Sequence, residues 1–240
     1  MIRQLAMAGM LLAGGMAFGD EIIAHWDFSK GKTDSVDGKF KMNCRGNTRI
    51  EGPAGKQYLE VGITGKDTPE GITSVKKYPE LTPKSAFRLE ITARLREQTT
   101  KKAGMVLWDN NYVMNASWGK HKDNPDSKKG LIVYLLRRKD GKFRPFASFG
   151  FAESLDSVWG DPVELEEDKD FTLALEYDGI KKVSFFLDGK LNRTTAVKKG
   201  GPLAPAVYPL IIGDRLGSIY SRFDGQILEV KLTALPSPEK

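Results

Sequence analysis

Apolar residues recur at every second position in four stretches of this chain, and this period constrains the fold more than any other feature. In FRLEITARL (87–95) every odd-numbered residue is apolar and every even-numbered one is polar. The alternation returns in FTLALEY (171–177), VSFFL (183–187) and LEVKL (228–232). Successive side chains of a β-strand point to opposite faces, so each stretch predicts a strand with one dry face. The dry faces of the last two are expected to hold Val183, Phe185, Leu187, Leu228, Val230 and Leu232.

Turn signals separate these predicted strands. Asp-Gly pairs occur at 140–141, 178–179, 188–189 and 224–225, and such pairs supply the positive φ angles that tight turns need. The five residues DGIKK between FTLALEY and VSFFL predict a hairpin. No amphipathic helix of three turns is found beyond the first 19 residues. Strands at this spacing without intervening helices predict an all-β fold of two packed antiparallel sheets.

The first 19 residues are typical of a secretory signal peptide. Arg3 precedes the apolar run LAMAGMLLAGGMAF, and Ala17 and Gly19 are small residues suited to cleavage before Asp20. The run is shorter than the roughly 20 residues that a membrane span needs. We expect an exported chain, whether periplasmic, secreted or on the cell surface. Residues 20–235 are expected to form a single domain and 236–240 a flexible tail.

Charge and cysteine content narrow the class of partner. The net charge is +6, but lysine and arginine occur in scattered pairs rather than in a stripe, and no nucleic-acid recognition motif accompanies them. Such lysines commonly protect sheet edges, so we expect no nucleic-acid partner. The single cysteine, Cys44, rules out an intrachain disulfide. We interpret it as a small buried hydrophobic residue in preference to an interchain crosslink.

Five stretches, taken in order, resemble the LamG-like (laminin G-like) jelly roll of the concanavalin A-like lectin/glucanase superfamily. IIAHWDFSKGKTDSVDGKF and GKQYLEVG resemble its opening strands, and SAFRLEITARLRE a later one. FTLALEYDGIKKVSFFLDGKL is similar to the family's hairpin with its two Asp-Gly turns. YPLIIGDRLGSIYSRFDGQILEVKL resembles the closing pair of strands, although Leu228 stands where the family usually has Asp. The resemblance covers essentially all of residues 21–233.

This resemblance implies a jelly-roll β-sandwich whose concave sheet or loop rim often binds glycans and sometimes calcium. It does not imply catalysis, because the same fold carries lectins, binding modules, glycosidases and lyases.

A search of the sequence for catalytic groups is negative. Glycoside hydrolysis needs two carboxylates flanking the scissile bond, and the acidic run VELEEDKD (163–170) lacks the family's Glu-x-Asp-x-Glu spacing. We interpret it as a charged turn. There is no Gly-x-Ser-x-Gly motif. His25 and His121 are the only histidines, which with one cysteine exclude a His/Cys zinc site. His25, beside Trp26 in the first strand, is expected to be structural.

The segment GMVLWDNNYVMNASWGKHKDNPDSKKG (104–130) carries the strongest binding signal. Trp and Tyr rings suit the apolar face of a sugar, and neighbouring amides and carboxylates suit its hydroxyls. Trp108 shares the alternation of Val106 and is expected in the core. Tyr112 and Trp118 are expected to be exposed. The alternative is a long loop between two strands. The predicted carbohydrate-binding residues are Asp109, Asn111, Tyr112, Asn115 and Trp118.

Two further sites are considered. Calcium takes oxygen ligands from loops, and Asp109, Asp123 and Asp126 could supply them; no other cofactor is expected. FGFAESLDSVWG (149–160), with Asp156 and Trp159, is a second candidate binding loop.

Taken together, the sequence favours an exported, non-catalytic LamG-like domain that binds a glycan or polysaccharide through loop aromatics. A structural or adhesive module with a protein partner is the alternative, and a polysaccharide-cleaving enzyme is less favoured.

Overall fold

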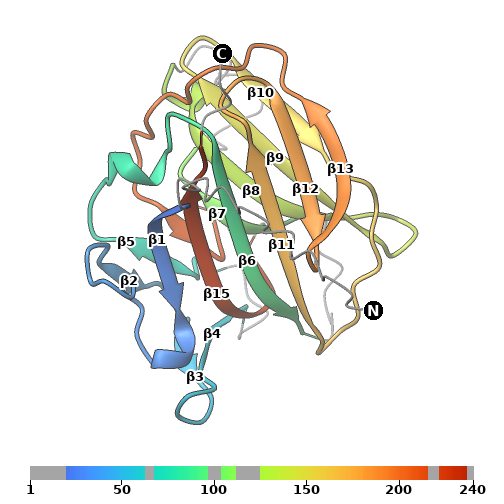
Figure 1. Ribbon diagram of the computed structural model, residues 1–240. Coiled ribbons are helices and arrows are strands. Elements are labelled where there is room, and N and C mark those ends of the chain that lie inside the picture. The colour runs from blue at the N-terminus through green and yellow to red at the C-terminus, as the bar shows by residue number, and fades with distance from the viewer. Residues whose placement is uncertain (1–19, 63–67, 97–103, 112–124, 216–221, 237–240) are drawn as a thin grey trace, which may run out of the picture.

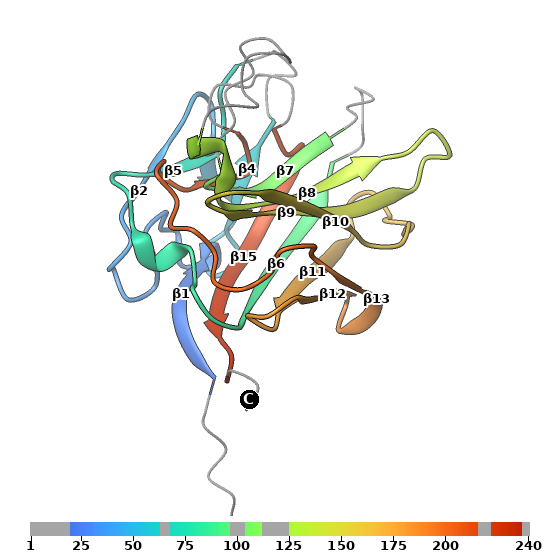
Figure 2. The ribbon, with the colours of Figure 1, turned by 90° about the horizontal axis from the view of Figure 1, so that it is seen from above.

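Two antiparallel β-sheets pack face to face in this protein (Figures 1 and 2). The computed structural model describes residues 20–62, 68–96, 104–111, 125–215 and 222–236. Within these ranges the helical segments are three short 3₁₀ turns, η1 (Phe28–Lys30), η2 (Pro79–Leu81) and η3 (Pro125–Lys128). The predicted all-β, two-sheet sandwich is therefore confirmed.

The first sheet has eight strands. Its hydrogen-bonded order is β13-β12-β11-β6-β15-β4-β3, with β1 also paired to β15. The strands are β1 (Glu21–Asp27), β3 (Arg49–Glu51), β4 (Tyr58–Val61), β6 (Phe87–Leu95), β11 (Asp170–Tyr177), β12 (Lys182–Leu187), β13 (Lys190–Ala196) and β15 (Gly225–Ala234).

The second sheet has seven strands in the order β10-β9-β8-β7-β14-β5-β2. They are β2 (Met42–Cys44), β5 (Ile72–Ser74), β7 (Gly104–Asp109), β8 (Lys129–Arg137), β9 (Phe143–Phe151), β10 (Leu155–Trp159) and β14 (Ile211–Ile212).

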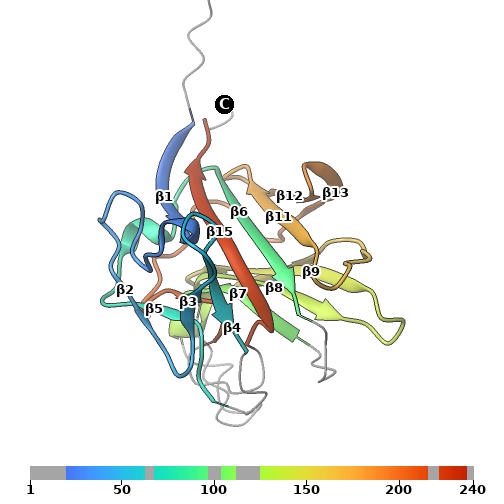
Figure 3. The same ribbon diagram turned by 90° about the horizontal axis from the view of Figure 1, so that it is seen from below.

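The C-terminal strand β15 lies in the middle of the eight-stranded sheet. One of its edges pairs with β6 along its whole length. The other edge pairs first with β4 and then with β1, the N-terminal strand. Figure 3 shows β1 beside β15, with β6 on the far side. The two ends of the described chain are thus held in one sheet.

The predicted alternation holds where strands are regular and fails at a bulge. In β6 the odd-numbered residues are all buried and the even-numbered ones partly exposed. In β15 the pairing register with β6 shifts between Ile227 and Glu229, so Leu228 is the extra residue. Ile227, Val230 and Leu232 are buried whereas Leu228 is only partly buried. The prediction that Leu228 shares the dry face of Val230 is therefore wrong.

A second bulge lies in β7, where the register with β8 shifts between Val106 and Trp108. Leu107 and Trp108 consequently both belong to the main core, while Val106 packs in a separate cluster on the outer face. Trp108 is fully buried, as predicted, but it does not share a face with Val106. A bulge turns a side chain to the other face without any change in hydrophobic composition.

Local turn chemistry explains the hairpins. The Asp178 carboxylate accepts the backbone N–H groups of Ile180, Lys181 and Lys182 at 2.8–2.9 Å, which closes the predicted β11–β12 hairpin. Asp188 and Gly189 have φ angles of 50° and 74° between the paired residues Leu187 and Lys190. This two-residue, positive-φ turn matches the right-handed twist of β12 and β13.

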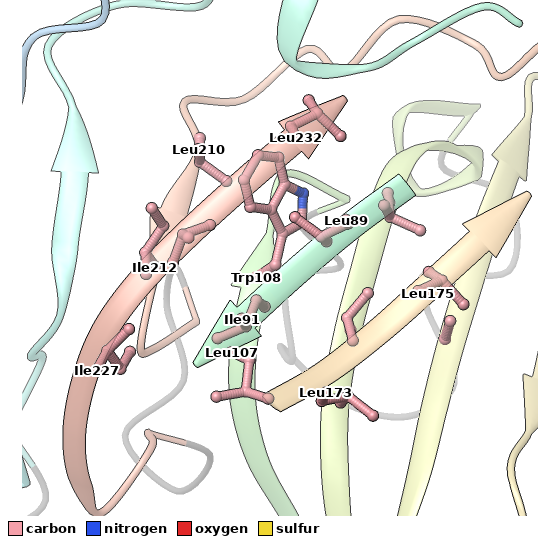
Figure 4. Close-up of a cluster of buried hydrophobic side chains, with 14 of the residues drawn as sticks. Leu89, Ile91, Leu107, Trp108, Leu173, Leu175, Leu210, Ile212, Ile227 and Leu232 are labelled. Atoms are coloured by element: carbon pink, nitrogen blue, oxygen red, sulfur yellow. The ribbon is translucent and has the colours of Figure 1, made fainter. Parts of the chain in front are cut away.

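Large side chains from both sheets fill the space between them. Trp26 of β1 and Trp108 of β7 meet edge to face at a centroid distance of 6.1 Å. Figure 4 shows Trp108 among Leu89 and Leu232 of the eight-stranded sheet and Leu210 beside β14. The indole nitrogens of both tryptophans are buried without a hydrogen-bond partner.

Cys44 lies on β2, at the edge of the seven-stranded sheet, and it is exposed. The interpretation of Cys44 as a buried hydrophobic residue is wrong, because β2 has a strand neighbour on one side only. Partial burial raises the pKa of its thiol.

We expect Ellman's reagent to label one thiol per native chain, with a rate that rises above pH 8 as the thiolate forms. Labelling only after denaturant is added would contradict this placement.

Within the part of the chain that the structure describes, no helix has the length and apolar character to cross a membrane.

Candidate ligand-binding face

The outer face of the seven-stranded sheet, turned away from the other sheet, carries a cluster of apolar and aromatic side chains. Here we call it the outer patch, and it consists of Val106, Ile132, Tyr134, Phe146 and Trp159. It is separate from the main core. Val106, Ile132 and Phe146 are buried, whereas Tyr134 and Trp159 are partly exposed. An aromatic cluster on the solvent side of a sheet is more informative than one inside it.

Strand register places four of these residues in a row across the sheet. Val106 of β7 pairs with Tyr134 of β8, which pairs with Phe146 of β9, which pairs with Trp159 of β10. Neighbouring strands lie about 4.8 Å apart, so the row is roughly 14 Å long. The centroid of the Phe146 ring lies 4.3 Å from the centroid of the Tyr134 ring and 4.2 Å from that of the Trp159 ring. The three rings therefore pack against one another, with Phe146 buried between the partly exposed Tyr134 and Trp159.

Polar side chains flank this row on both sides. On one side the Arg144 guanidinium lies 5.2 Å from the centre of the Trp159 ring, and its Nε donates to the Gly160 carbonyl at 2.8 Å. On the other side the hydroxyls of Ser148 and Ser157 are 2.7 Å apart. An apolar strip with polar groups at its margins suits a ligand that has an apolar face and polar edges.

A positive charge stands near the Tyr134 end of the patch. Burial raises the pKa of the Tyr134 phenol, and the nearby charge of Arg215 opposes that shift. The phenol is therefore neutral at pH 7 and can donate a hydrogen bond. Nε of Arg215 lies 3.4 Å from the Asp109 carboxylate, which links the patch to a buried group of charges.

Asp109 and Asp214 are the central carboxylates of that group. Burial raises the pKa of each to about 6, although the guanidiniums of Arg215 and Arg45 act in the opposite direction. Asp214 accepts the backbone N–H of Glu70 at 2.7 Å and lies 3.5 Å from Arg45. One oxygen of each aspartate is buried without a hydrogen-bond partner.

The sugar-binding residues predicted from the sequence divide into two sets. Asp109 and Asn111 are buried, with 2% and 1% of their surface exposed. Oδ1 of Asp109 accepts the backbone N–H of Asn111, and the Asn111 amide donates to the Lys129 carbonyl. Tyr112, Asn115 and Trp118 lie outside the described residues. The assignment of this segment to sugar binding stays a prediction.

The proposed calcium ligands also divide into residues that the structure describes and one that it does not. Asp109 is buried beside Arg215, Asp126 forms an ion pair with Lys129 at 2.8 Å, and Asp123 lies outside the described ranges. Among the residues whose positions are described, no three His, Cys, Asp or Glu side chains are grouped to hold a metal ion.

The second candidate loop is mostly strand. Residues 149–151 end β9 and residues 155–159 form β10, so the loop is only a short hairpin connection. Asp156 is buried, and it accepts the backbone N–H of Lys199 at 2.6 Å. Trp159, in contrast, joins the outer patch. Of the candidate binding residues that the sequence suggested and the structure describes, Trp159 is the one that lies in this patch.

Tyr134, Phe146 and Arg144 were not expected from the sequence. A signal was present in KGLIVYLLR (129–137), which is apolar at nearly every position instead of alternating. A continuous apolar run in an antiparallel sandwich indicates that both faces of the strand are covered or used.

The acidic run lies just before β11, and His25 lies in β1. Residues 166–170 are exposed, and a turn at residues 167–168 lies just before β11, which agrees with the interpretation as a charged turn. His25 of β1 hydrogen-bonds Glu229 of β15 through Nε2 at 2.7 Å, which matches a structural role.

Several solved structures resemble most of this chain in fold, although their sequence identity to it is low. Domain 4 of AbnA, a GH43 extracellular arabinanase from Geobacillus stearothermophilus solved with arabinotriose, is 12% identical with a TM-score of 0.58; the match covers 90% of this chain and 93% of that one. The binding domain of botulinum neurotoxin DC, solved with rat synaptotagmin II, is 12% identical with a TM-score of 0.62. The type C neurotoxin, whose cell entry depends on interaction with two ganglioside molecules, is 10% identical with a TM-score of 0.60.

This chain spans about half of those neurotoxin chains, 48% and 47%, while 88% of its own length is matched. No protein-family model matches the sequence. No curated protein matches it either. At these identities the likeness shows a shared β-sandwich fold and nothing finer.

Proposed function

We propose that this protein is an exported, non-catalytic LamG-like domain that binds polysaccharide across the outer patch. The observation that carries the proposal is the row of Tyr134, Phe146 and Trp159, which lies apart from the main core and leaves the Tyr134 and Trp159 rings partly exposed on either side of the buried Phe146. Aromatic rings offer large, rigid contact area to the apolar face of a sugar ring. Ser148, Ser157 and the Tyr134 hydroxyl can bond hydroxyls at its edge.

Two comparisons support the ligand class. One similar fold was solved with arabinotriose, and another belongs to a toxin that interacts with gangliosides. A sandwich of this kind is thus suited to glycan recognition in other proteins. The neurotoxin domain solved with synaptotagmin supports a protein partner as the second candidate.

Replacement of Trp159 or Tyr134 by alanine is expected to weaken polysaccharide retention. Loss of one stacked ring removes about 0.5–1.5 kcal/mol beyond the buried area, and 1.4 kcal/mol is tenfold in affinity. We expect a loss of about tenfold for each variant, measured by affinity electrophoresis in gels that contain a panel of soluble polysaccharides. The melting temperature is expected to change by only a few degrees, because both rings are already partly exposed.

The matched control is Phe186→Ala. Phe186 lies on the outer face of the other sheet under Arg88, at 5.0 Å from the guanidinium carbon to the ring centre, much as Trp159 lies beside Arg144. This control is expected to bind like the unaltered protein. Equal retention of all three variants would refute the proposed site. Retention on no polysaccharide, together with capture of a protein ligand, would favour the adhesive alternative.

A further inference from the structure

We propose that the glycan bound at the outer patch is anionic, and that Arg144 pairs with its carboxylate or sulfate group. This inference rests on the proposed function and names the chemical class of its ligand. It is drawn from the charge balance of the two outer faces of the sandwich, which differ although their architecture is similar.

Each outer face carries one arginine over an aromatic ring. On the eight-stranded sheet, Arg88 lies over Phe186 and is neutralised by two carboxylates, with Glu90 at 3.0 Å and Glu176 at 2.5 Å. Two further cations of that face are also paired with carboxylates. Arg94 lies 2.7 Å from Asp170, and Lys231 lies 3.2 Å from Glu90. On this face the arginine over the aromatic ring is therefore neutralised by carboxylates of the protein itself.

Arg144 on the seven-stranded sheet has no such balance. Its Nε donates to the Gly160 carbonyl, and no carboxylate oxygen of the described residues lies within 4.0 Å of the guanidinium. The acids near this end of the sheet are held by other cations: Asp161 by Arg193 at 2.8 Å and Glu164 by Lys142 at 2.9 Å. The two terminal nitrogens of Arg144 thus keep their donor capacity for a ligand.

The outer patch itself contributes no compensating charge. Among the described outward-facing residues of β7 to β10, Asp109 is the one acid, and it is buried against Arg215. Arg215, near the Tyr134 end of the row, is paired with Asp109, so among the described residues the unpaired positive charge of the patch is that of Arg144. A surface with unbalanced positive charge attracts anions, and a guanidinium fork matches the geometry of a carboxylate or sulfate. The Trp159 ring holds Arg144 in place by a cation–π contact.

A neutral glycan would gain little from this arrangement. A guanidinium can donate to sugar hydroxyls, but a carboxylate or sulfate accepts charge-assisted, bidentate hydrogen bonds that are roughly twice as strong. The ring of the same sugar would lie on Trp159, because Arg144 and Trp159 are adjacent on the face.

The test uses pairs of polysaccharides that share a backbone and differ in charge. We choose polygalacturonate and its methyl ester, alginate and its propylene glycol ester, carboxymethylcellulose and hydroxyethylcellulose, and dextran sulfate and dextran. For at least one pair, the charged member is expected to bind at least tenfold more tightly than its neutral partner. Raising NaCl from 50 to 500 mM is expected to remove most of that difference, because salt screens the ion pair. Carboxylate pairs and the sulfate pair separate the two sources of charge.

Arg144→Gln is expected to lower affinity for the charged member to that of the neutral one, with no effect on the neutral one. Arg88→Gln is the matched control and is expected to leave both unchanged. If Arg144→Gln does not fold, the pairs and the salt series still decide the point with the unaltered protein.

The outcomes separate the inference from the function on which it rests. Equal binding of charged and neutral members, with both lost in Trp159→Ala, would overturn the anionic class and leave the proposed function in place. Retention on no member of any pair would overturn both.

Discussion

Replacement of Trp108 by alanine is expected to lower the free energy of unfolding by about 3–5 kcal/mol, the usual range for a large aromatic residue removed from a core. Trp108 is fully buried and meets Trp26 edge to face between the sheets. The cavity would open where β7 and β14 pack against β6 and β15, as Figure 4 shows. Urea denaturation followed by circular dichroism measures the change.

Trp108→Phe separates packing from polarity. The buried indole nitrogen of Trp108 has no hydrogen-bond partner, and an unsatisfied buried donor costs about 1–3 kcal/mol. Phenylalanine removes that cost while it keeps most of the ring, so we expect a much smaller loss than for alanine. A loss below about 1 kcal/mol in Trp108→Ala would contradict the placement of this ring in the core.

The second large effect is a rise in stability as the pH falls from 7 to 5. Burial raises the folded-state pKa of Asp109 and of Asp214 from 3.8 to about 6. Between these values the folded state holds protons that the unfolded state has released, so the free energy of unfolding falls as pH rises through this window. One pKa unit corresponds to about 1.4 kcal/mol, and about one unit of each shift is realised between pH 7 and pH 5, so we expect about 1.4 kcal/mol from each carboxylate over this range.

Calorimetry between pH 4.5 and 7.5 tests this expectation. The melting temperature is expected to be at least about 5 °C higher at pH 5 than at pH 7. Carboxylates with lowered pKa values, such as those of Asp34 and Glu90, act in the opposite direction but below about pH 4. Asp109→Asn is expected to remove about half of the pH dependence. A melting temperature that rises steadily from pH 4.5 to 7.5 would contradict the raised pKa values.

The fold was predictable because the strand signal is local. The alternation of apolar and polar residues in β6, β11 and β12 depends only on residues two positions apart. The turns at Asp178 and Asp188 are likewise determined by the turn residues themselves, through the Asp178 side-chain hydrogen bond and the positive φ of Asp188. The bulges at Leu107 and Leu228 were not predictable in the same way. A bulge is set by how two strands distant in sequence match in length and twist, and no residue type marks it.

The candidate site was less predictable for a related reason. Tyr134, Phe146 and Trp159 come from three strands, and only the pairing register brings them into one row. Trp159 was singled out as an aromatic residue near a turn, but nothing local indicates that it faces Phe146. The exposed position of Cys44 likewise follows from the place of β2 in the order of strands, which composition does not reveal.

The central place of β15 also determines when the eight-stranded sheet can form. Until residues 225–234 have left the ribosome, β6 lacks one of its two neighbours, and β1 has no partner in the described sheet. The pairing of β1 with β15 joins positions about as far apart in sequence as the chain allows, and contacts of this kind close slowly. The eight-stranded sheet is therefore expected to be completed only after β15 has been synthesised, and a chain halted short of Gly225 would leave unpaired edges on β6 and β1 that favour aggregation.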